Sequence, residues 1–188
     1  MQRTIFGVFA ILLLSLSGTN QSFSQSSDSV KTESVTRLEL MTVGVSRELA
    51  ISQNTTLFGK IGLFSTLRST IALIDRSGSG ISTHWFPVVD LQYRKYTNLG
   101  KRAAKGKSIK GNTGNYLSIK ALAYLPELLP NSELDDAVSL GPMWGMQRQF
   151  NDQLSLDLAA GLGYQFRFDL NNRIIPLITF NMAYRLSK

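Results

Sequence analysis

The sequence predicts an all-β fold, a small antiparallel transmembrane β-barrel of about eight strands that follows a cleaved signal peptide. Three observations predict this fold class. The N-terminal segment is apolar and unlike the rest, no later apolar run reaches the roughly 18 residues of a spanning helix, and apolar residues alternate with small or polar ones. The 188 residues suffice for one domain, and the 43% hydrophobic content disfavours a wholly disordered chain.

The N-terminus has the three parts of a secretory signal peptide. Arg3 supplies the positive charge, residues 5–16 form the apolar region, and Ser22 and Ser24 are small residues that allow cleavage before Gln25. The apolar region is shorter than the roughly 20 residues of a membrane span, although a retained anchor helix remains the alternative. We therefore expect a signal peptide over 1–24, a flexible segment over 25–36 and a barrel domain over 37–188.

The chain has no cysteine. A lipoprotein anchor, disulfide bonds and thiolate metal sites are therefore excluded. An exported domain without disulfides needs another source of stability, which backbone pairing in a closed barrel supplies.

The clearest alternation lies between residues 155 and 168. The even positions are Leu156, Leu158, Ala160, Leu162, Tyr164, Phe166 and Phe168, and the odd positions are Ser155, Asp157, Ala159, Gly161, Gly163, Gln165 and Arg167. A helix would scatter these apolar residues around its circumference, whereas a strand places them all on one face. We expect the apolar face to point toward lipid and the small or polar face to line a narrow interior.

Similar patterns predict seven strands, over about 37–50, 55–67, 84–96, 115–125, 137–149, 154–167 and 175–187. An antiparallel barrel closes with an even number of strands, so an eighth is expected, either within 69–81 or before Arg37. Pro142 would interrupt the fifth of these strands locally. Aromatic residues near strand ends on the apolar face would lie at the membrane interfaces; they are Tyr164, Phe166, Phe168 and Tyr184.

A soluble sandwich or a lipocalin-like barrel would show the same alternation with the apolar face turned inward. The composition of the strand face opposite the apolar one decides between these folds and a transmembrane barrel. This face is rich in Gly, Ala and Ser with isolated charges, as in a packed barrel interior, whereas the solvent face of a soluble sheet usually carries Thr, Lys and Glu.

Two stretches resemble the small outer-membrane β-barrel proteins of Gram-negative bacteria. The first runs from Leu91 to Lys107 and continues at Gly114-Asn115-Tyr116-Leu117-Ser118; it is similar to a YYNLxKRxxKGK…SGNYLS segment of a largely uncharacterised set of such barrels, with Lys95 and Thr97 departing from that pattern. The second runs from Gly141 to Arg148 and continues through a hairpin to Tyr184 and Arg185. The resemblance implies an outer-membrane location. Neither stretch is a catalytic signature. The final Leu186-Ser187-Lys188 replaces the aromatic residue usual at the end of such chains.

Two groups of charged residues are the candidate sites. The inner faces of the predicted strands carry a lumen charge network of Glu48, Lys60, Asp90, Arg94, Lys120, Asp157 and Arg185. In a barrel of about eight strands these side chains should pair with one another and fill the interior, because isolated buried charges are costly. A transport pathway would need a wider barrel.

The second group is a basic segment around the link 97–114. Its members are basic residues with no acid between them; they are Lys95, Lys101, Arg102, Lys105, Lys107 and Lys110, and Arg94 directly precedes them. The structural interpretation is a solvated link with one or two helical turns near 99–105, ended by Gly106. The functional interpretation is a surface for anionic headgroups or another polyanion. If the last strand ends in the periplasm, strand counting places this segment there, with the links 52–55 and 151–153.

Catalysis has one candidate, the sole histidine, His84, which shares strand parity with Ser82. No metal, nucleotide or phosphate-loop motif is present, so no cofactor is expected. We expect a non-enzymatic outer-membrane barrel with a structural, envelope-stabilising or surface-interaction role. Its partners would be outer-membrane lipid and the outer-membrane assembly machinery, not nucleic acid. The alternatives are a barrel enzyme acting on envelope lipid, such as a lipid A deacylase, and a soluble lipocalin-like binder of an apolar ligand.

Overall fold

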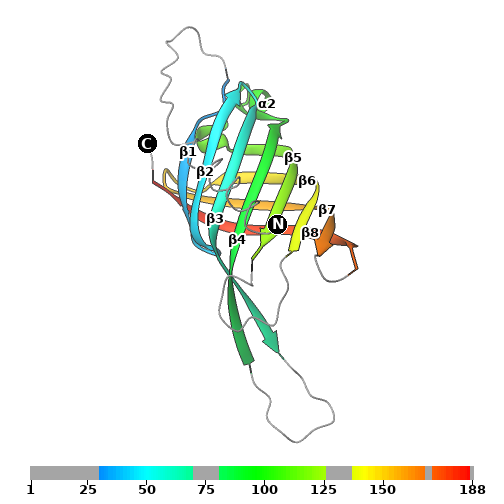
Figure 1. Ribbon diagram of the computed structural model, residues 1–188. Coiled ribbons are helices and arrows are strands. Elements are labelled where there is room, and N and C mark those ends of the chain that lie inside the picture. Colours follow the sequence, from blue (N-terminus) through cyan, green and yellow to red (C-terminus); the bar gives the residue numbers. More distant parts are fainter. Residues whose placement is uncertain (1–29, 70–80, 126–136, 168–170, 187–188) are drawn as a thin grey trace, which may run out of the picture.

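A computed structural model shows eight antiparallel strands closed into one ring (Figure 1). It describes residues 30–69, 81–125, 137–167 and 171–186, with the backbone alone for 65–69 and 81–84. The strands are β1 (Val35–Glu39), β2 (Val43–Ser52), β3 (Thr55–Ser69), β4 (Ile81–Tyr96), β5 (Gly114–Tyr124), β6 (Ala137–Gln149), β7 (Leu154–Arg167) and β8 (Arg173–Arg185). Two short helical elements, α2 (Leu99–Ala103) and η2 (Lys110–Asn112), lie in the link between β4 and β5.

Each strand pairs with its neighbours in sequence, and β1 pairs with β8 to close the ring. This confirms the predicted all-β, eight-stranded antiparallel architecture. Six of the seven predicted strand ranges match β3 to β8 to within a few residues. The predicted turns of helix before Gly106 are confirmed as α2, and Gly106 itself has a positive φ of 65°, a conformation that glycine adopts at no steric cost.

The predicted strand over 37–50 is wrong, because this stretch forms two strands. A turn at residues 40–42 separates β1 from β2, and β1 begins at Val35. The missing eighth strand is therefore β1, at the N-terminal side of the predicted range, and the ring closes without the alternative at 69–81. Residues 70–80 lie outside the described residues.

Side-chain direction follows the predicted period of two. On β7 the polar or small residues Ser155, Asp157 and Ala159 are buried inside the ring, while Leu162 and Tyr164 are exposed on the outside. Inward-facing glycines make room for large neighbours. A Cβ on Gly145 would lie 2.3 Å from the Tyr116 ring, and one on Gly163 would lie 2.7 Å from Leu177. The interior is thus filled by matched small and large residues.

Pro142 interrupts the pairing of β6 with β7, as its missing N–H requires. Leu140 lies opposite Tyr164 and Met143 opposite Gly161, with no paired residues between them. The register is the same on both sides of the gap, so the proline causes a local defect without shifting the strand.

The two ends of the ring differ. At one end, the β2–β3 turn and the long β4–β5 link contact residues 30–34, which precede β1, and the β6–β7 turn contacts the end of β8; we call this the plugged end. At the other end, β3 and β4 continue as a two-stranded ribbon beyond their neighbours (Figure 1). Their mutual pairing reaches Ser69 opposite Ile81, whereas β4 pairs with β5 only as far as Val88.

No helix among the described residues is long and apolar enough to cross a membrane.

Candidate functional site

The interior of the ring is charged and buried. Four cations and four anions among the described residues are less than one-tenth exposed; they are Arg37, Lys60, Arg94 and Lys120, and Glu39, Glu48, Asp90 and Asp157. Six residues of the predicted lumen network belong to this set, and the seventh, Arg185, lies half-buried at the plugged end. The equal numbers of opposite charges limit the cost of removing them from water.

Arg94 lies at the centre of the largest group of contacts. Its guanidinium donates to Asp157 Oδ2 at 2.8 Å, to Gln92 Oε1 at 2.8 Å and to Gln147 Oε1 at 3.1 Å. The same group lies between two rings, 3.9 Å from the centroid of Phe58 and 4.5 Å from that of Tyr116. Tyr116 donates its hydroxyl proton to Asp157 Oδ1 at 2.7 Å. Every polar nitrogen of this guanidinium therefore has an acceptor, and both faces are covered.

Glu48 forms a second group nearer the plugged end. Its carboxylate accepts hydrogen bonds from Arg37 at 2.9 Å, from the Thr56 hydroxyl at 2.7 Å and from the Tyr96 hydroxyl at 2.7 Å. These donors come from three different strands, β1, β3 and β4. One buried carboxylate on β2 thus joins four consecutive strands, β1 to β4.

Asp90 forms a third group with two lysines. Its Oδ2 lies 3.0 Å from Lys120 Nζ and 3.8 Å from Lys60 Nζ, and Gln92 Nε2 donates to both carboxylate oxygens. Lys120 also donates to the Thr179 hydroxyl at 3.0 Å. Gln92 joins this group to Arg94, so the Asp90 and Arg94 groups form one connected network.

The link between β4 and β5 closes the plugged end. Gly111 and Asn112 are buried, and the Gly111 carbonyl accepts from Arg37 at 2.9 Å and from Gln147 at 2.5 Å. Leu99 at the start of α2 is buried against Gly114, where a Cβ would come within 2.8 Å of Leu99 Cδ2. We call residues 97–113 the end plug.

A strap over residues 30–34 holds the end plug from outside. The backbone N–H and C=O of Glu33 pair with the Asn112 side chain at 2.7 and 2.8 Å. The Glu33 carboxylate accepts from the Gly111 backbone N–H at 3.0 Å and from Arg185 at 3.2 Å. Thr32 donates its hydroxyl proton to the Ser52 carbonyl at 2.5 Å. The strap therefore joins β2, the end plug and β8.

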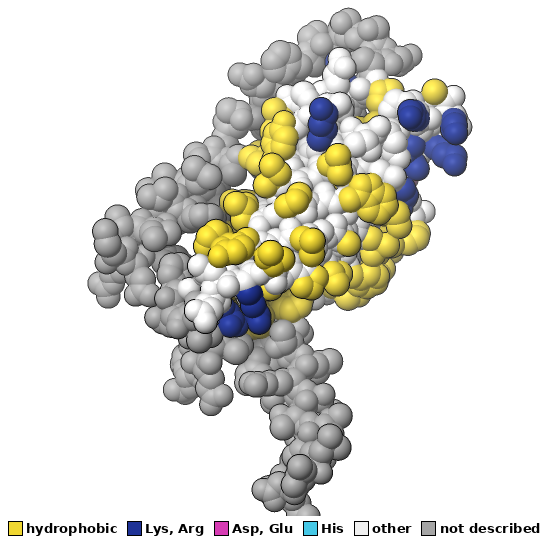
Figure 2. All heavy atoms as spheres, turned by 90° about the vertical axis from the view of Figure 1, so that its right-hand side faces the viewer, with side chains coloured by type: hydrophobic (Ala, Val, Ile, Leu, Met, Phe, Trp, Pro, Cys, Tyr) yellow, Lys and Arg dark blue, Asp and Glu magenta, His cyan; other side chains and the backbone are white. Residues whose placement is uncertain are grey.

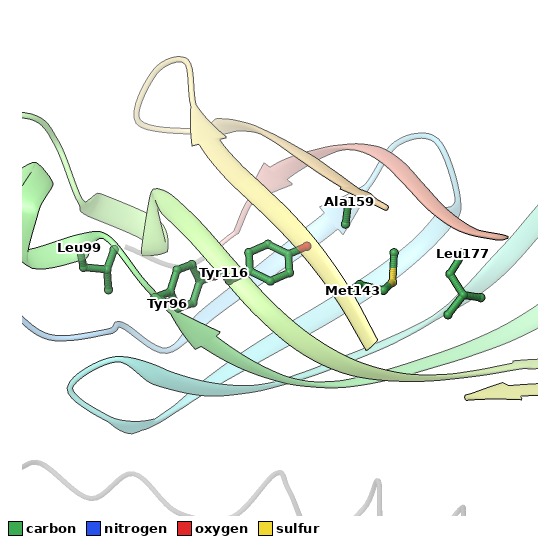
Figure 3. Close-up of a cluster of buried hydrophobic side chains, with 6 residues drawn as sticks. All are labelled: Tyr96, Leu99, Tyr116, Met143, Ala159 and Leu177. Atoms are coloured by element: carbon green, nitrogen blue, oxygen red, sulfur yellow. The ribbon is translucent and has the colours of Figure 1, made fainter. Parts of the chain in front are cut away.

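Hydrophobic residues fill the remaining interior (Figure 3). The buried cluster consists of Tyr96, Leu99, Tyr116, Met143, Ala159 and Leu177. It extends along the inside of the ring from the end plug, at Leu99, toward the other end, at Leu177. Leu177, a deviation from the sequence alternation, is buried here because Gly163 leaves room for it.

Sequence reasoning missed several members of the network. Arg37 and Glu39 were missed because β1 and β2 were predicted as one strand. The other missed members carry no formal charge; they are Gln92, Tyr96, Tyr116 and Gln147. A signal was available for most of them. Gln92, Arg94 and Tyr96 share the parity of Asp90 on β4, and Gln147 shares the inward parity of β6.

The basic segment lies on the outside of the plugged end. Lys95, Lys101, Lys105, Lys107 and Lys110 are exposed and Arg102 is half-buried. Arg94, which precedes them in sequence, points inward and belongs to the interior network instead. Strand parity explains the separation, since Arg94 and Lys95 face opposite sides of β4.

Chemistry beyond charge pairing has few candidates here. Within the described ranges, no group of three or more His, Asp and Glu residues is arranged to hold a metal ion. The side chains of Ser82 and His84, the candidate pair behind the alternative of a barrel enzyme, lie outside the described residues. The buried hydroxyl oxygens of Ser46, Ser118 and Ser139 lack protein partners, and none of these serines has a histidine as a neighbour in its strand pairing.

The outer wall is apolar around the whole ring. Each of the eight strands presents large hydrophobic residues that are exposed; examples in strand order are Leu38, Val45, Ile61, Tyr93, Ile119, Trp144, Leu162 and Ile178. Figure 2 shows one side of this wall, where hydrophobic side chains cover the middle and Lys and Arg side chains gather toward the ends. We call this surface the apolar belt.

No family model, curated protein or solved structure matched the chain.

Proposed function

We propose that this chain is an outer-membrane β-barrel protein of a Gram-negative bacterium, exported by a signal peptide, with a non-enzymatic structural or surface-interaction role. One observation carries the proposal, the inverted distribution of polarity. Charged residues are buried inside the ring, and large apolar residues are exposed on all eight strands. Water would penalise both features, whereas a bilayer around the ring favours the second and leaves the first undisturbed.

The magnitude of the exposed apolar surface supports a lipid environment. Ile174 and Ile178 on β8 are 73% and 76% exposed, and Phe180 on the same face is 59% exposed. Burying one such side chain contributes about 1.5–3 kcal/mol. A belt of these residues on every strand is far larger than the few apolar residues scattered on an ordinary soluble surface.

The alternatives receive less support. A lipocalin-like binder needs an apolar interior, whereas this interior holds four ion-paired cations and the carboxylates that pair with them. Nothing described favours a lipid-modifying enzyme. A filled interior with a plugged end suits a protein that acts through its outer surfaces, as a structural or adhesive component of the envelope.

Tyr164 and Phe166 are exposed at the ribbon end of β7, with ring centroids 4.9 Å apart. Such aromatic residues suit a membrane interface. Tyr184 is half-buried, and Phe168 lies outside the described residues. The proposal places the plugged end in the periplasm, and insertion would depend on the outer-membrane assembly machinery.

Membrane fractionation combined with a gel-shift assay tests the proposal. The full-length protein expressed in a Gram-negative host should sediment with the outer membrane, and should migrate faster on a gel when left unheated because the closed ring resists detergent. Recovery as a soluble periplasmic monomer with no heat-dependent shift would overturn it.

A further inference from the structure

The end plug carries an unusual concentration of positive charge. We call the side chains of Lys95, Lys101, Arg102, Lys105, Lys107 and Lys110 the basic platform. No acidic residue occurs in the sequence between Asp90 and Glu127. The platform therefore has no local carboxylates that would neutralise it within its own segment.

The platform is held in place by the fold. Leu99 anchors α2 in the buried cluster, and the Asn98 side chain accepts from the Asn115 backbone N–H at 2.7 Å. Arg102 donates from two nitrogens to the Ser108 carbonyl, at 3.0 and 3.3 Å, and so closes the loop after α2. The lysines consequently project from an ordered base and not from a free chain, which lowers the entropy lost on binding.

The platform begins where the apolar belt ends. On the outer face of β4, Tyr93 is 51% exposed and the next outward residue is Lys95. On the outer face of β6, Trp144 and Met146 are followed by Arg148, whose guanidinium donates to Asn115 Oδ1 at 2.5 Å. Around β4 to β6, aromatic or aliphatic residues thus give way directly to cations, as at the boundary between hydrocarbon and headgroups.

Most of these cations have no ionic partner. In the described part of the chain, no ion pair involves Lys95, Lys101, Lys105 or Lys107. Lys110 alone lies near a carboxylate, 3.5 Å from Asp152, and both side chains are largely exposed. By contrast, the interior cations are all paired or hydrogen-bonded. Among the described residues, the fold therefore leaves several cations of the plugged-end rim without a neutralising carboxylate.

We propose that the basic platform binds the headgroups of anionic phospholipids in the adjoining leaflet. This inference rests on the proposed membrane insertion, and it names anionic phospholipid as the partner of the plugged end of the protein. Cations next to a bilayer surface attract anionic lipids, and the attraction falls off within a Debye length. The basic platform would lie next to the bilayer surface and close to the headgroups, because its charged side chains lie beside the apolar belt that would contact the acyl chains.

Two single-tryptophan proteins provide the test. Trp144 faces outward and its strand neighbour Leu117 is paired with Lys95, whereas Trp85 lies on the ribbon at the other end. The W85F protein therefore reports on lipid near the platform, and the W144F protein reports on lipid far from it. Each is reconstituted in phosphatidylcholine vesicles that contain either brominated phosphatidylglycerol or brominated phosphatidylcholine, and tryptophan quenching gives the relative association of the two lipids.

We expect the ratio of phosphatidylglycerol to phosphatidylcholine association at Trp144 to be roughly five in low salt, and to decrease as salt is added. The K101Q/K105Q/K107Q substitution should bring this ratio close to one while leaving the ratio at Trp85 unchanged. The matched control R167Q/R173Q, at the ribbon end, should leave the Trp144 ratio unchanged.

A Trp144 ratio of one in the protein with its lysines intact would overturn the inference, as would a ratio that the triple substitution leaves unchanged. If either of these results is obtained while lipid quenches both tryptophans, the inference about the basic platform is wrong but the proposed membrane insertion is not contradicted. Absence of quenching by either brominated lipid would overturn the membrane insertion as well.

Discussion

Arg94 illustrates how this protein keeps charge inside a narrow ring. It is fully buried, and its stability there depends on a carboxylate, two amide oxygens and two aromatic faces at the same time. Lysine could satisfy the charge but not this geometry, because its ammonium is a compact point charge without a planar fork. The residue type, and not only the charge, is therefore required at this position.

Removing the Arg94 side chain should destabilise the protein strongly. We expect R94L to lower the free energy of unfolding by about 3–5 kcal/mol, because Asp157 would be left buried without its cation. R94K should fall between R94L and the unsubstituted protein. Urea unfolding in vesicles, followed by tryptophan fluorescence, measures the difference.

The matched control is K110Q, which removes one partner of the exposed pair with Asp152. Exposed pairs contribute only about 0–1 kcal/mol, so K110Q should behave nearly as the unsubstituted protein does. Equal effects of R94L and K110Q would contradict the role given to the interior network.

The fit of Leu177 against Gly163 gives a second prediction at this scale. G163A would place a Cβ 2.7 Å from Leu177 Cδ1, and overpacking of this kind costs about 1–3 kcal/mol. In the double variant G163A/L177A the clash is absent, so the two substitutions should be less destabilising together than the sum of their separate effects. A double-mutant cycle measures the coupling, and additive effects would show that the two side chains do not share the space.

Among the elements, the first two strands show what the sequence pattern could and could not predict. Leu38 and Leu40 point outward at even positions, whereas Val43 and Val45 point outward at odd positions. This change of parity marks the turn at residues 40–42. It was hard to recognise because Leu40, Met41 and Thr42 include none of the Gly, Pro, Asn or Asp residues that usually mark turns. The later hairpins were predicted correctly where such polar residues are present, as at 151–153.

The strap and the end plug form the element whose contacts are least local. Glu33 contacts residues about 80 and 150 positions away in sequence, so no pattern within one strand could predict it. The structure alone brings residues 30–34, the β4–β5 link and β8 together. The sequence predicted the helical turns of the link but not its insertion into the end of the ring.

Loss of the Glu33 carboxylate should loosen the end plug while leaving the ring closed. In E33A, the carboxylate that accepts from the Gly111 N–H and Arg185 is absent, so trypsin should cut the protein faster within residues 101–110. Limited proteolysis in detergent, with mass spectrometry of the fragments, measures this rate. D152A, which removes an exposed carboxylate at the same end, is the control, and equal rates in the two variants would contradict a holding role for Glu33.

For the whole molecule, polarity is arranged by the direction of each side chain, and this was the most predictable property. A period of two on the last three strands predicted both the closed sheet and the face that points outward. The sequence also predicted six of the eight interior charges from strand parity, and it missed Arg37 and Glu39 because β1 and β2 were predicted as one strand. It could not predict their partners, since the distances between Arg94, Asp157 and Gln147 depend on the stagger of strands around the ring.

A charge placed on the apolar belt tests the proposed environment of the whole molecule. Ile178 lies midway along β8 and is 76% exposed. Arginine at the middle of a bilayer costs about 2–4 kcal/mol in such a barrel, so I178R should fold less completely into vesicles, as judged by the heat-dependent gel shift. A104R, at an exposed position of the end plug, adds the same charge and should fold normally. Equal folding of the two variants would argue against a lipid-facing belt.

The seam between β1 and β8 affects the order of assembly. Seven of the eight strand pairings join neighbours in sequence, whereas this one joins strands separated by most of the chain. Its ladder pairs three residues, Arg37 with Arg185, Leu38 with Tyr184 and Glu39 with Ala183, and two backbone hydrogen bonds flank it, from the Leu40 N–H to the Met182 carbonyl at 2.8 Å and from the Leu186 N–H to the Thr36 carbonyl at 2.9 Å. Because few hydrogen bonds offset the entropy of joining such distant segments, ring closure should be the slow final event of folding. Until it occurs, both seam strands retain a free edge that could pair with another chain.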